Sequence, residues 1–139
     1  MPENLPIQIN PIDLEPDVAL GVNLPMNADN GAGLSSTFYT KDQVKANMRS
    51  VLSTMIGERV MQPTFGTYLY NMLFEQTNAD LKEKQIRNEI DRAIGLWVPQ
   101  VSVEDVSFPE VVDNKFVRVT ISYTIPNQNV QDELTLEVT

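Results

Sequence analysis

The sequence predicts an α+β domain in which two main helices and a short one pack on a small antiparallel three-stranded sheet, with an extended N-terminal arm. Three observations lead to this fold class. Apolar residues recur every three or four positions in two stretches before Pro99, they alternate with polar residues after it, and prolines crowd the first 36 residues. Helical periods followed by strand periods are typical of helices that cover one face of an antiparallel sheet.

Residues 1–36 are expected to form the arm, and residues 37–139 the globular domain. The arm holds five of the nine prolines and no lysine or arginine. Its prolines exclude a regular helix. Because apolar residues such as Val18, Leu20 and Val22 are interleaved with them, two states remain open, disorder in isolation and order on a partner.

The first helical pattern lies between Thr40 and Gly57. Thr40 and Gln43 have the spacing of a capping box, in which each side chain bonds the other residue's backbone N–H at a helix start. Gly57 is placed to end the helix, because glycine adopts the left-handed conformation that closes many helices. The apolar face of this helix would consist of Val44, Met48, Val51, Leu52 and Met55.

A short helix is expected next, over about residues 68–74, and the second main helix follows it. Asn78 is a candidate N-cap, and Asp80 lies in the first turn, where the helix dipole favours negative charge. The helix should end near Gly95, since Pro99 prevents its continuation. Its apolar face would consist of Leu81, Ile86, Ile90, Ile94 and Trp97.

Three strands are expected after Pro99, with turns at residues 113–115 and 126–129 between them. The last strand runs to the end of the sequence, which favours a place at the sheet edge, where its N–H and C=O groups can pair with another chain. The alternative is an edge without a partner, protected by the charges of Glu133 and Glu137. The core-facing residues of the last two strands would be Val117, Val119, Ile121, Tyr123, Leu134, Leu136 and Val138.

The connector, residues 57–66, contains two glycines and a proline within ten positions that belong to neither helix. Loops of this composition often hold a fixed shape for a contact or a site. Pro63 and Gly66 indicate a rigid turn that buries Phe65, with Gly66 permitting a positive φ or a close backbone approach. The sequence therefore predicts an ordered contact loop here.

Glu58 and Arg59 in the connector allow two interpretations. They form a solvated or local pair of little energetic weight, or the arginine fork faces a carboxylate of this chain or of a partner. Glu58 and Glu75 flank the connector, and two carboxylates about 5–9.5 Å apart can hydrolyse a glycoside. With 19 acidic residues in 139, such a pair is expected by chance, so a cell-wall-degrading activity is only an alternative.

Composition excludes several classes of function. The chain has no cysteine and no histidine, which removes disulfides, thiolate nucleophiles, imidazole bases and the usual zinc ligands. A net charge of −9 argues against nucleic acid as a partner. No apolar run approaches the ~20 residues that cross a bilayer, and residues 1–4 lack the basic start of a secretory signal. No cofactor, metal site or membrane contact is expected.

Three motifs together resemble a known family: Gly57-Glu58-Arg59, Pro63-x-Phe65-Gly66 and Leu73-Phe74-Glu75. Followed by a second helix, a proline and alternating strands, they are similar to the baseplate wedge subunits of contractile phage tails, the GPW or gene-25-like family. The similarity runs from Val44 to the C-terminus. The arm, with Ala19 to Pro25, looks like the longer phage members rather than the type VI secretion relatives.

The resemblance implies a structural, non-enzymatic subunit that resides in the virion baseplate and is assembled in the host cytoplasm. Members of the family join the inner wedge, where long wedge proteins form a helical bundle, to the first ring of sheath subunits. The terminal strand would offer its edge to the sheath, which is β-augmentation. Six copies would follow from the symmetry of the tail, and tube or hub proteins are further possible partners.

One departure from the family pattern concerns the turn after the second helix. The family has Glu-Pro-Arg there, whereas this chain has Val98-Pro99-Gln100, so an ion-pair role is not carried over. Some relatives have been labelled lysozymes, which keeps the glycosidase alternative open. The predicted partner-binding residues are Gly57, Glu58, Arg59, Pro63, Phe65, Gly66, Val98, Pro99, Gln100, Leu134, Leu136 and Val138.

Overall fold

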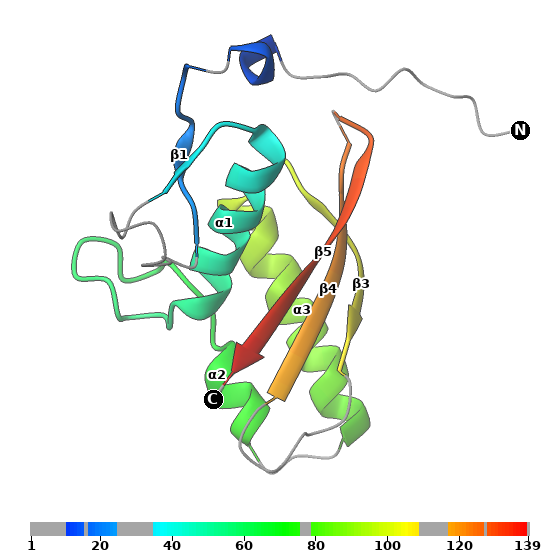
Figure 1. Cartoon of the computed structure of the whole chain (residues 1–139). Helices are drawn as coiled ribbons and strands as arrows, with labels where there is room; N and C mark the ends of the chain where they lie inside the picture. Colours follow the sequence, from blue (N-terminus) through cyan, green and yellow to red (C-terminus); the bar gives the residue numbers. More distant parts are fainter. Residues whose placement is uncertain are drawn as a thin grey trace, which may run out of the picture.

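A computed structural model describes residues 11–15, 17–24, 35–75, 79–108, 117–126 and 128–138. In these ranges the predicted α+β class is confirmed, with helices on one face of an antiparallel sheet (Figure 1). The elements in order are a 3₁₀ helix η1 (Pro11–Leu14), β1 (Gly21–Val22), β2 (Ser36–Thr37), α1 (Thr40–Ser53), α2 (Leu69–Phe74), α3 (Ala79–Trp97), β3 (Ser102–Ser107), β4 (Val117–Ile125) and β5 (Val130–Val138).

The main sheet has the strand order β3-β4-β5 and is antiparallel throughout. This confirms the predicted meander and places β5 at an edge of the described sheet. The register of β4 with β5 is unbroken from Val117↔Val138 to Ile125↔Val130. The predicted turn at 126–129 joins these two strands, whereas the predicted turn at 113–115 lies outside the described residues.

Between β3 and β4 the register shifts between Val103 and Asp105. A bulge places an extra residue in one strand and changes which side chains face the core beyond it. This explains why Val101 and Val106, five positions apart, are both buried, which strict alternation would not allow.

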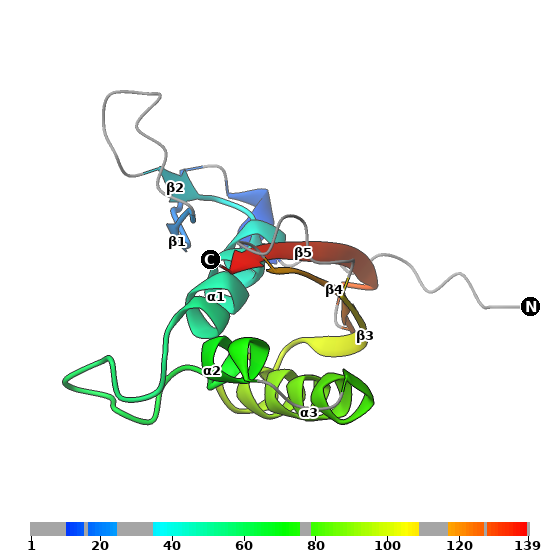
Figure 2. The same ribbon diagram turned by 90° about the horizontal axis from the view of Figure 1, so that it is seen from below.

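The core lies between the sheet and the helices, as seen along the strands in Figure 2. On β4 and β5 the predicted core positions are confirmed: Val119, Ile121, Tyr123 and Leu134 are at most 1% exposed. Helix α1 packs near β5 and α3 near β3. No helix in the described part of the chain is long and apolar enough to cross a membrane.

Helix α1 differs from its prediction at both ends. It begins at Thr40 with Tyr39 as N-cap, and the Tyr39 side chain makes no capping hydrogen bond. The predicted capping box is therefore wrong: the Thr40 N–H donates to Asp13 Oδ1 at 2.8 Å, and the Gln43 side chain bonds Thr37 and Asn47. The helix ends at Ser53, four residues before Gly57, because Thr54 and Met55 turn into a short backbone ladder with Thr67.

Helix α3 ends at Trp97 rather than near Gly95, and its predicted N-cap lies outside the described residues. Ile86, Ile90 and Ile94 are buried as predicted, but Leu81 is 55% exposed. At 100° per residue Leu81 lies about 140° round the helix from Ile86, outside the buried face.

The described part of the arm lies on the domain. Strand β1 pairs antiparallel with β2, with Gly21 opposite Thr37, and both strands contact α1. Asp13 in η1 accepts hydrogen bonds from Thr40 at the start of α1 and from Gln128 Nε2 in the β4–β5 turn, the latter at 3.3 Å. The carboxylate thus ties the arm to two elements at one end of the domain.

Candidate partner-binding surfaces

The connector is anchored at its base by backbone hydrogen bonds. Met55 and Thr67 form an isolated parallel bridge, in which the Thr67 N–H donates to Thr54 O at 2.9 Å and the Ile56 N–H donates to Thr67 O at 3.3 Å. Nearer the tip, the Gly57 N–H donates to Pro63 O at 2.8 Å. The loop therefore has a fixed shape set by its own main chain.

Both connector glycines have a conformational reason to be glycine. Gly57 has φ +92° and Gly66 has φ +111°. At Gly66 an added Cβ would also lie 2.3 Å from Thr54 O, which is inside the space that any side chain needs. The predicted positive φ and the predicted close backbone approach both occur at Gly66.

Arg59 lies over the ring of Phe65, with its Cζ 3.8 Å from the ring centroid. Phe65 is 8% exposed, as predicted, and its ring meets Trp97 edge-on at 4.9 Å between centroids. This cation–π stack fixes the connector to the end of α3. This contact was not predicted, because Arg59 and Phe65 lie six positions apart and their spacing indicates a contact only once the turn between them is known.

Glu58 and Arg59 are both exposed, and each makes its own contact within the loop. A carboxylate of a partner that faces Arg59 stays a prediction. Glu58 Oε2 accepts a hydrogen bond from the Met55 N–H at 3.0 Å. Arg59 stacks on Phe65 and its Nη2 donates to Ser50 Oγ at 3.4 Å. No ion pair joins Glu58 to Arg59 among the described residues. Both side chains thus shape the loop itself.

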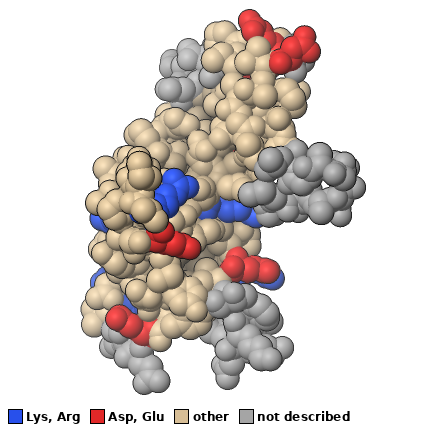
Figure 3. Space-filling model, turned by 90° about the vertical axis from the view of Figure 1, so that its left-hand side faces the viewer, with Lys and Arg blue, Asp and Glu red and all other residues tan. Residues whose placement is uncertain are grey.

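The tip of the connector carries the most exposed apolar pair of the described chain. Val60 is 95% exposed and Met61 93%. The connector projects on the left of Figure 1, and Figure 3 shows that the described part of this face carries few charged side chains. Sequence analysis missed this pair. The available signal was two adjacent apolar residues inside a loop that belongs to neither helical face.

The turn after α3 exposes two of its three predicted contact residues. Pro99 and Gln100 are exposed, whereas Val98 is 2% exposed and belongs to the core. The Val98 N–H donates to Ile94 O at 2.8 Å and the Val101 N–H donates to Val98 O at 3.1 Å, so the turn continues tightly from the helix. Any contact made by this segment uses Pro99 and Gln100.

Strand β5 presents its predicted contact residues, Leu134, Leu136 and Val138, to the interior. Leu134 is fully buried and Leu136 is 6% exposed. These side chains position the strand, and within the described sheet β5 pairs with β4 alone. A groove of about 250 Å³ runs beside the C-terminal end of β5. Its walls include Leu52, Thr54, Met55, Glu58, Thr67, Leu69, Tyr70, Leu136, Glu137 and Val138.

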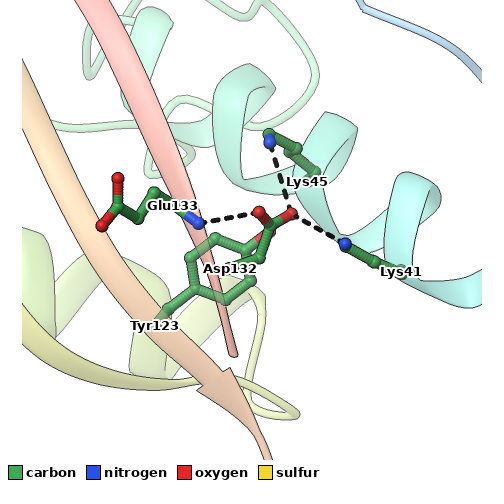
Figure 4. A network of polar contacts seen from close by, with 5 residues as sticks. All are labelled: Lys41, Lys45, Tyr123, Asp132 and Glu133. Atoms are coloured by element: carbon green, nitrogen blue, oxygen red, sulfur yellow. Dashed lines mark hydrogen bonds and ion pairs between the residues drawn. The ribbon is translucent and has the colours of Figure 1, made fainter. Parts of the chain in front are cut away.

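Asp132 fixes the other end of β5 to α1 (Figure 4). Its Oδ2 lies 3.3 Å from Lys45 Nζ and 3.7 Å from Lys41 Nζ, and Tyr123 Oη lies 3.3 Å from the same oxygen. Burial alone would raise the pKa of Asp132, but the Glu133 N–H and the two lysines outweigh it and lower the pKa. Burial and the Asp132 charge raise the pKa of Tyr123.

Glu89 is a buried carboxylate that positions α2. It forms a bidentate pair with Arg92, with N–O distances of 2.7 and 2.9 Å, and it accepts the Tyr68 N–H at 3.0 Å. The bonds from Arg92 outweigh burial and lower the pKa of Glu89. Since Tyr68 is the N-cap of α2, this contact ties the end of the connector to α3. This contact could not be predicted from the sequence, because the spacing of Glu89 and Arg92 is that of an ordinary exposed helix pair.

The carboxylate pair of the glycosidase alternative is not gathered in one cleft. Glu58 lines the groove together with Glu137, and Glu75 is not among the groove's lining residues. Glu75 follows the last turn of α2, where Lys82 Nζ donates to its backbone oxygen at 3.1 Å. The described residues contain no cluster of three or more acidic side chains that could hold a metal ion.

Among the described residues, the α+β domain combines an apolar-tipped loop with an edge strand, and both are surfaces typical of contacts with other proteins. The sequence profile of the family described as baseplate wedge protein gp25 matches residues 39–130, and the chain belongs to this family. The predicted family is thus confirmed. It is a structural family of contractile-tail baseplates. A comparison with curated protein sequences gave no match.

Several solved structures share the fold. A Geobacter sulfurreducens protein provisionally described as a tail lysozyme is 26% identical, with TM-score 0.62 over 70% of this chain and 87% of that one. A chain of the post-contraction pyocin R2 baseplate is 25% identical, with TM-score 0.53 over 60% and 82%. A chain of the anti-feeding prophage baseplate is 24% identical, with TM-score 0.61 over 76% and 83%, and shows the fold alone.

Proposed function

We propose that this baseplate protein links the helical bundle of the long wedge proteins to the first sheath ring, and that β5 provides the sheath attachment by β-augmentation. The observation that carries the proposal is the position of β5. It is a nine-residue strand that pairs with β4 along its whole length and lies at an edge of the described sheet. A sheath strand added there would continue the sheet.

The connector and the turn after α3 are proposed to contact the long wedge proteins. Support comes from the exposure of Val60 and Met61 on a loop whose backbone is already fixed. A preformed loop loses little conformational entropy on binding, so its apolar tip can contribute most of its burial to affinity. Pro99 and Gln100 would form a second exposed contact.

The arm, residues 1–36, is proposed to order further on neighbouring subunits, with residues 37–139 as the wedge domain. The contacts of Asp13 and β1 with the domain hold part of the arm at the α1 end. Six copies per baseplate in the virion tail would be arranged by heterologous contacts with other subunits, rather than by a ring that the chain forms alone. Tube or hub proteins are further candidate neighbours.

The proposed role needs no catalysis. The groove that contains Glu58 has about 250 Å³, below the ~300–1,000 Å³ of typical small-molecule sites. A glycan chain threaded between two carboxylates needs more room than this. One Glu58 oxygen already accepts a backbone hydrogen bond, which gives this side chain a structural role.

Cross-linking from single cysteines tests the proposal, because the chain has no cysteine of its own. Thr135→Cys places the probe on the exposed outer face of β5, and Leu96→Cys places a control on α3, where Leu96 is 59% exposed. Assembled particles would be treated with a short thiol-to-amine cross-linker, and the products identified by mass spectrometry. We expect Thr135→Cys to capture the sheath subunit and Leu96→Cys not to capture it.

Two other outcomes would count against the proposal. If Leu96→Cys captured the sheath and Thr135→Cys did not, the attachment would lie elsewhere on the domain. If purified particles contained sheath and long wedge proteins but neither cysteine variant, a structural role of this protein in the tail would be refuted.

A further inference from the structure

The two faces of β5 have different chemistry, and a strand added beside it would meet both. Side chains alternate between the faces of a strand. Leu134, Leu136 and Val138 face the core, and the outer face of β5 presents Gln131, Glu133, Thr135 and Glu137, all exposed. Apart from Asp132, which is held by Lys41 and Lys45, the core-facing row is apolar, whereas the outer row contains two carboxylates.

The outer carboxylates are only partly neutralised within the domain. Glu137 pairs with Arg118 across the strands at 2.8 Å. No cation of the described residues lies within ion-pair distance of the Glu133 carboxylate. Directly opposite charges on adjacent strands attract and like charges repel. The outer row of β5 therefore favours lysine or arginine on a neighbouring strand.

On an added strand, the side chains that point toward the core side of the sheet would enter the groove beside the C-terminal end of β5. Leu52, Leu69, Leu136 and Val138 supply apolar walls there, and Glu58 and Glu137 lie at the same groove. A volume of about 250 Å³ suits one or two side chains rather than a whole ligand. The groove thus favours an apolar side chain on the core side of the added strand.

A second copy of this chain does not fit the same edge. If two β5 strands paired edge to edge with their apolar rows on the same side, Glu133 and Glu137 of one chain would lie beside those of the other. Like charges at neighbouring cross-strand positions destabilise the pair, and the net charge of −9 adds to the repulsion. The occupant is therefore a strand of another protein.

We propose that β5 selects a partner strand whose residues alternate between apolar and basic, with the apolar residues toward the groove and the basic residues beside Glu133 and Glu137. This inference rests on the proposed strand addition and specifies the chemistry of the incoming strand. Two favourable cross-strand charge pairs correspond to about a tenfold preference over an uncharged strand.

The test uses four dye-labelled nine-residue peptides, the length of β5, and the full chain. One alternates valine and lysine, one valine and threonine, and one valine and glutamate. The fourth has the composition of the first with its lysines in one block, which controls for non-specific attraction to an acidic protein. Fluorescence anisotropy measures affinity, and amide hydrogen exchange by NMR reports whether the edge N–H groups of β5 become protected.

We expect the alternating valine–lysine peptide to bind about tenfold more tightly than the valine–threonine peptide, and to protect every second amide of β5. The block peptide and the valine–glutamate peptide should bind weakly. Glu133→Lys should reduce the affinity for valine–lysine several-fold. Asp91→Lys, an equal charge change on an exposed position of α3, should leave most of the preference in place.

The failures of the inference and of the strand-addition proposal look different. Equal affinity for all alternating peptides, with protection of β5, would overturn the charge selection and leave strand addition standing. Equal binding of the block and alternating lysine peptides would also overturn it. If no peptide protected the β5 amides, strand addition at this edge would fail and the inference with it.

Discussion

Replacing Gly66 by alanine should destabilise the domain more than the same change at Gly57. Both residues have positive φ, which costs a non-glycine residue about 1–3 kcal/mol. At Gly57 an added Cβ meets nothing within 4 Å, whereas at Gly66 it would lie 2.3 Å from Thr54 O. Relief of that clash has to move the Thr54–Thr67 ladder, whose two backbone hydrogen bonds contribute about 1 kcal/mol each.

The expected losses are therefore about 1–2 kcal/mol for Gly57→Ala and about 3–4 kcal/mol for Gly66→Ala. Urea unfolding followed by circular dichroism measures both, and Tm should fall by about 3–5 °C for each kcal/mol in a chain of this size. Equal losses for the two variants would refute the reasoning, since they would show that the clash with Thr54 does not constrain the loop. A Gly66→Ala variant with unchanged stability would refute the reasoning more strongly.

Three further predictions concern the polar network, the connector tip and catalysis. Asp132→Asn should lower the free energy of unfolding by about 1–2 kcal/mol at neutral pH, because it removes the charge partner of Lys41 and Lys45. Because the folded-state pKa of Asp132 is lowered, its contribution to stability is present above the unfolded pKa of about 3.9 and is lost as pH falls through the lower folded pKa. The free energies of unfolding of the two proteins should therefore converge in acid. A constant difference between them from neutral pH to acid would contradict the network. Met61→Asp should change stability by less than about 0.5 kcal/mol, since the side chain is 93% exposed, yet it should reduce the recovery of long wedge proteins in an affinity pull-down. Gln85→Asp, at an exposed position on α3, is the control. Equal recovery with the two variants would show that the connector tip does not contact the wedge proteins. Glu58→Gln should leave particle assembly intact and the native chain should clear no peptidoglycan in a zymogram, whereas clearing by the native chain that vanishes in Glu58→Gln would revive the glycosidase alternative.

The sequence predicts well those elements whose side-chain pattern is local. Alternation along β4 and β5 identifies the core row and hence the register, because a slip of one residue would turn Ile121 and Leu134 to solvent. The apolar spacing also predicts the buried faces of α1 and α3, but Met55, predicted on the first of them, lies beyond the end of α1 and is 39% exposed. Leu81 departs from the predicted face because five residues of helix separate it from Ile86 by about 140°, which turns it to solvent.

The features that sequence analysis missed depend on contacts between distant positions. Asp13 reaches Thr40 and Gln128 from 27 and 115 positions away, so a local capping box looked sufficient at the start of α1. Asp132 occupies a core-facing position of β5, opposite Tyr123, and only the approach of α1 explains a charge there. The exposure of Val60 and Met61 follows from the closure of the connector, which no local pattern encodes.

The same residues that keep β5 from indiscriminate pairing also determine where a partner strand can join. An inward-pointing charge and outward carboxylates are common protections of an edge strand, and β5 has both. Asp132, held by Lys41 and Lys45, makes the N-terminal part of the inner row polar, so an apolar strand gains little there. Because Asp132 separates Val130 from Leu134, the inner row is continuously apolar only from Leu134 onward, and the groove lies at that end. Removal of the Asp132 charge should therefore weaken the domain and, at the same time, relax the register in which an added strand binds.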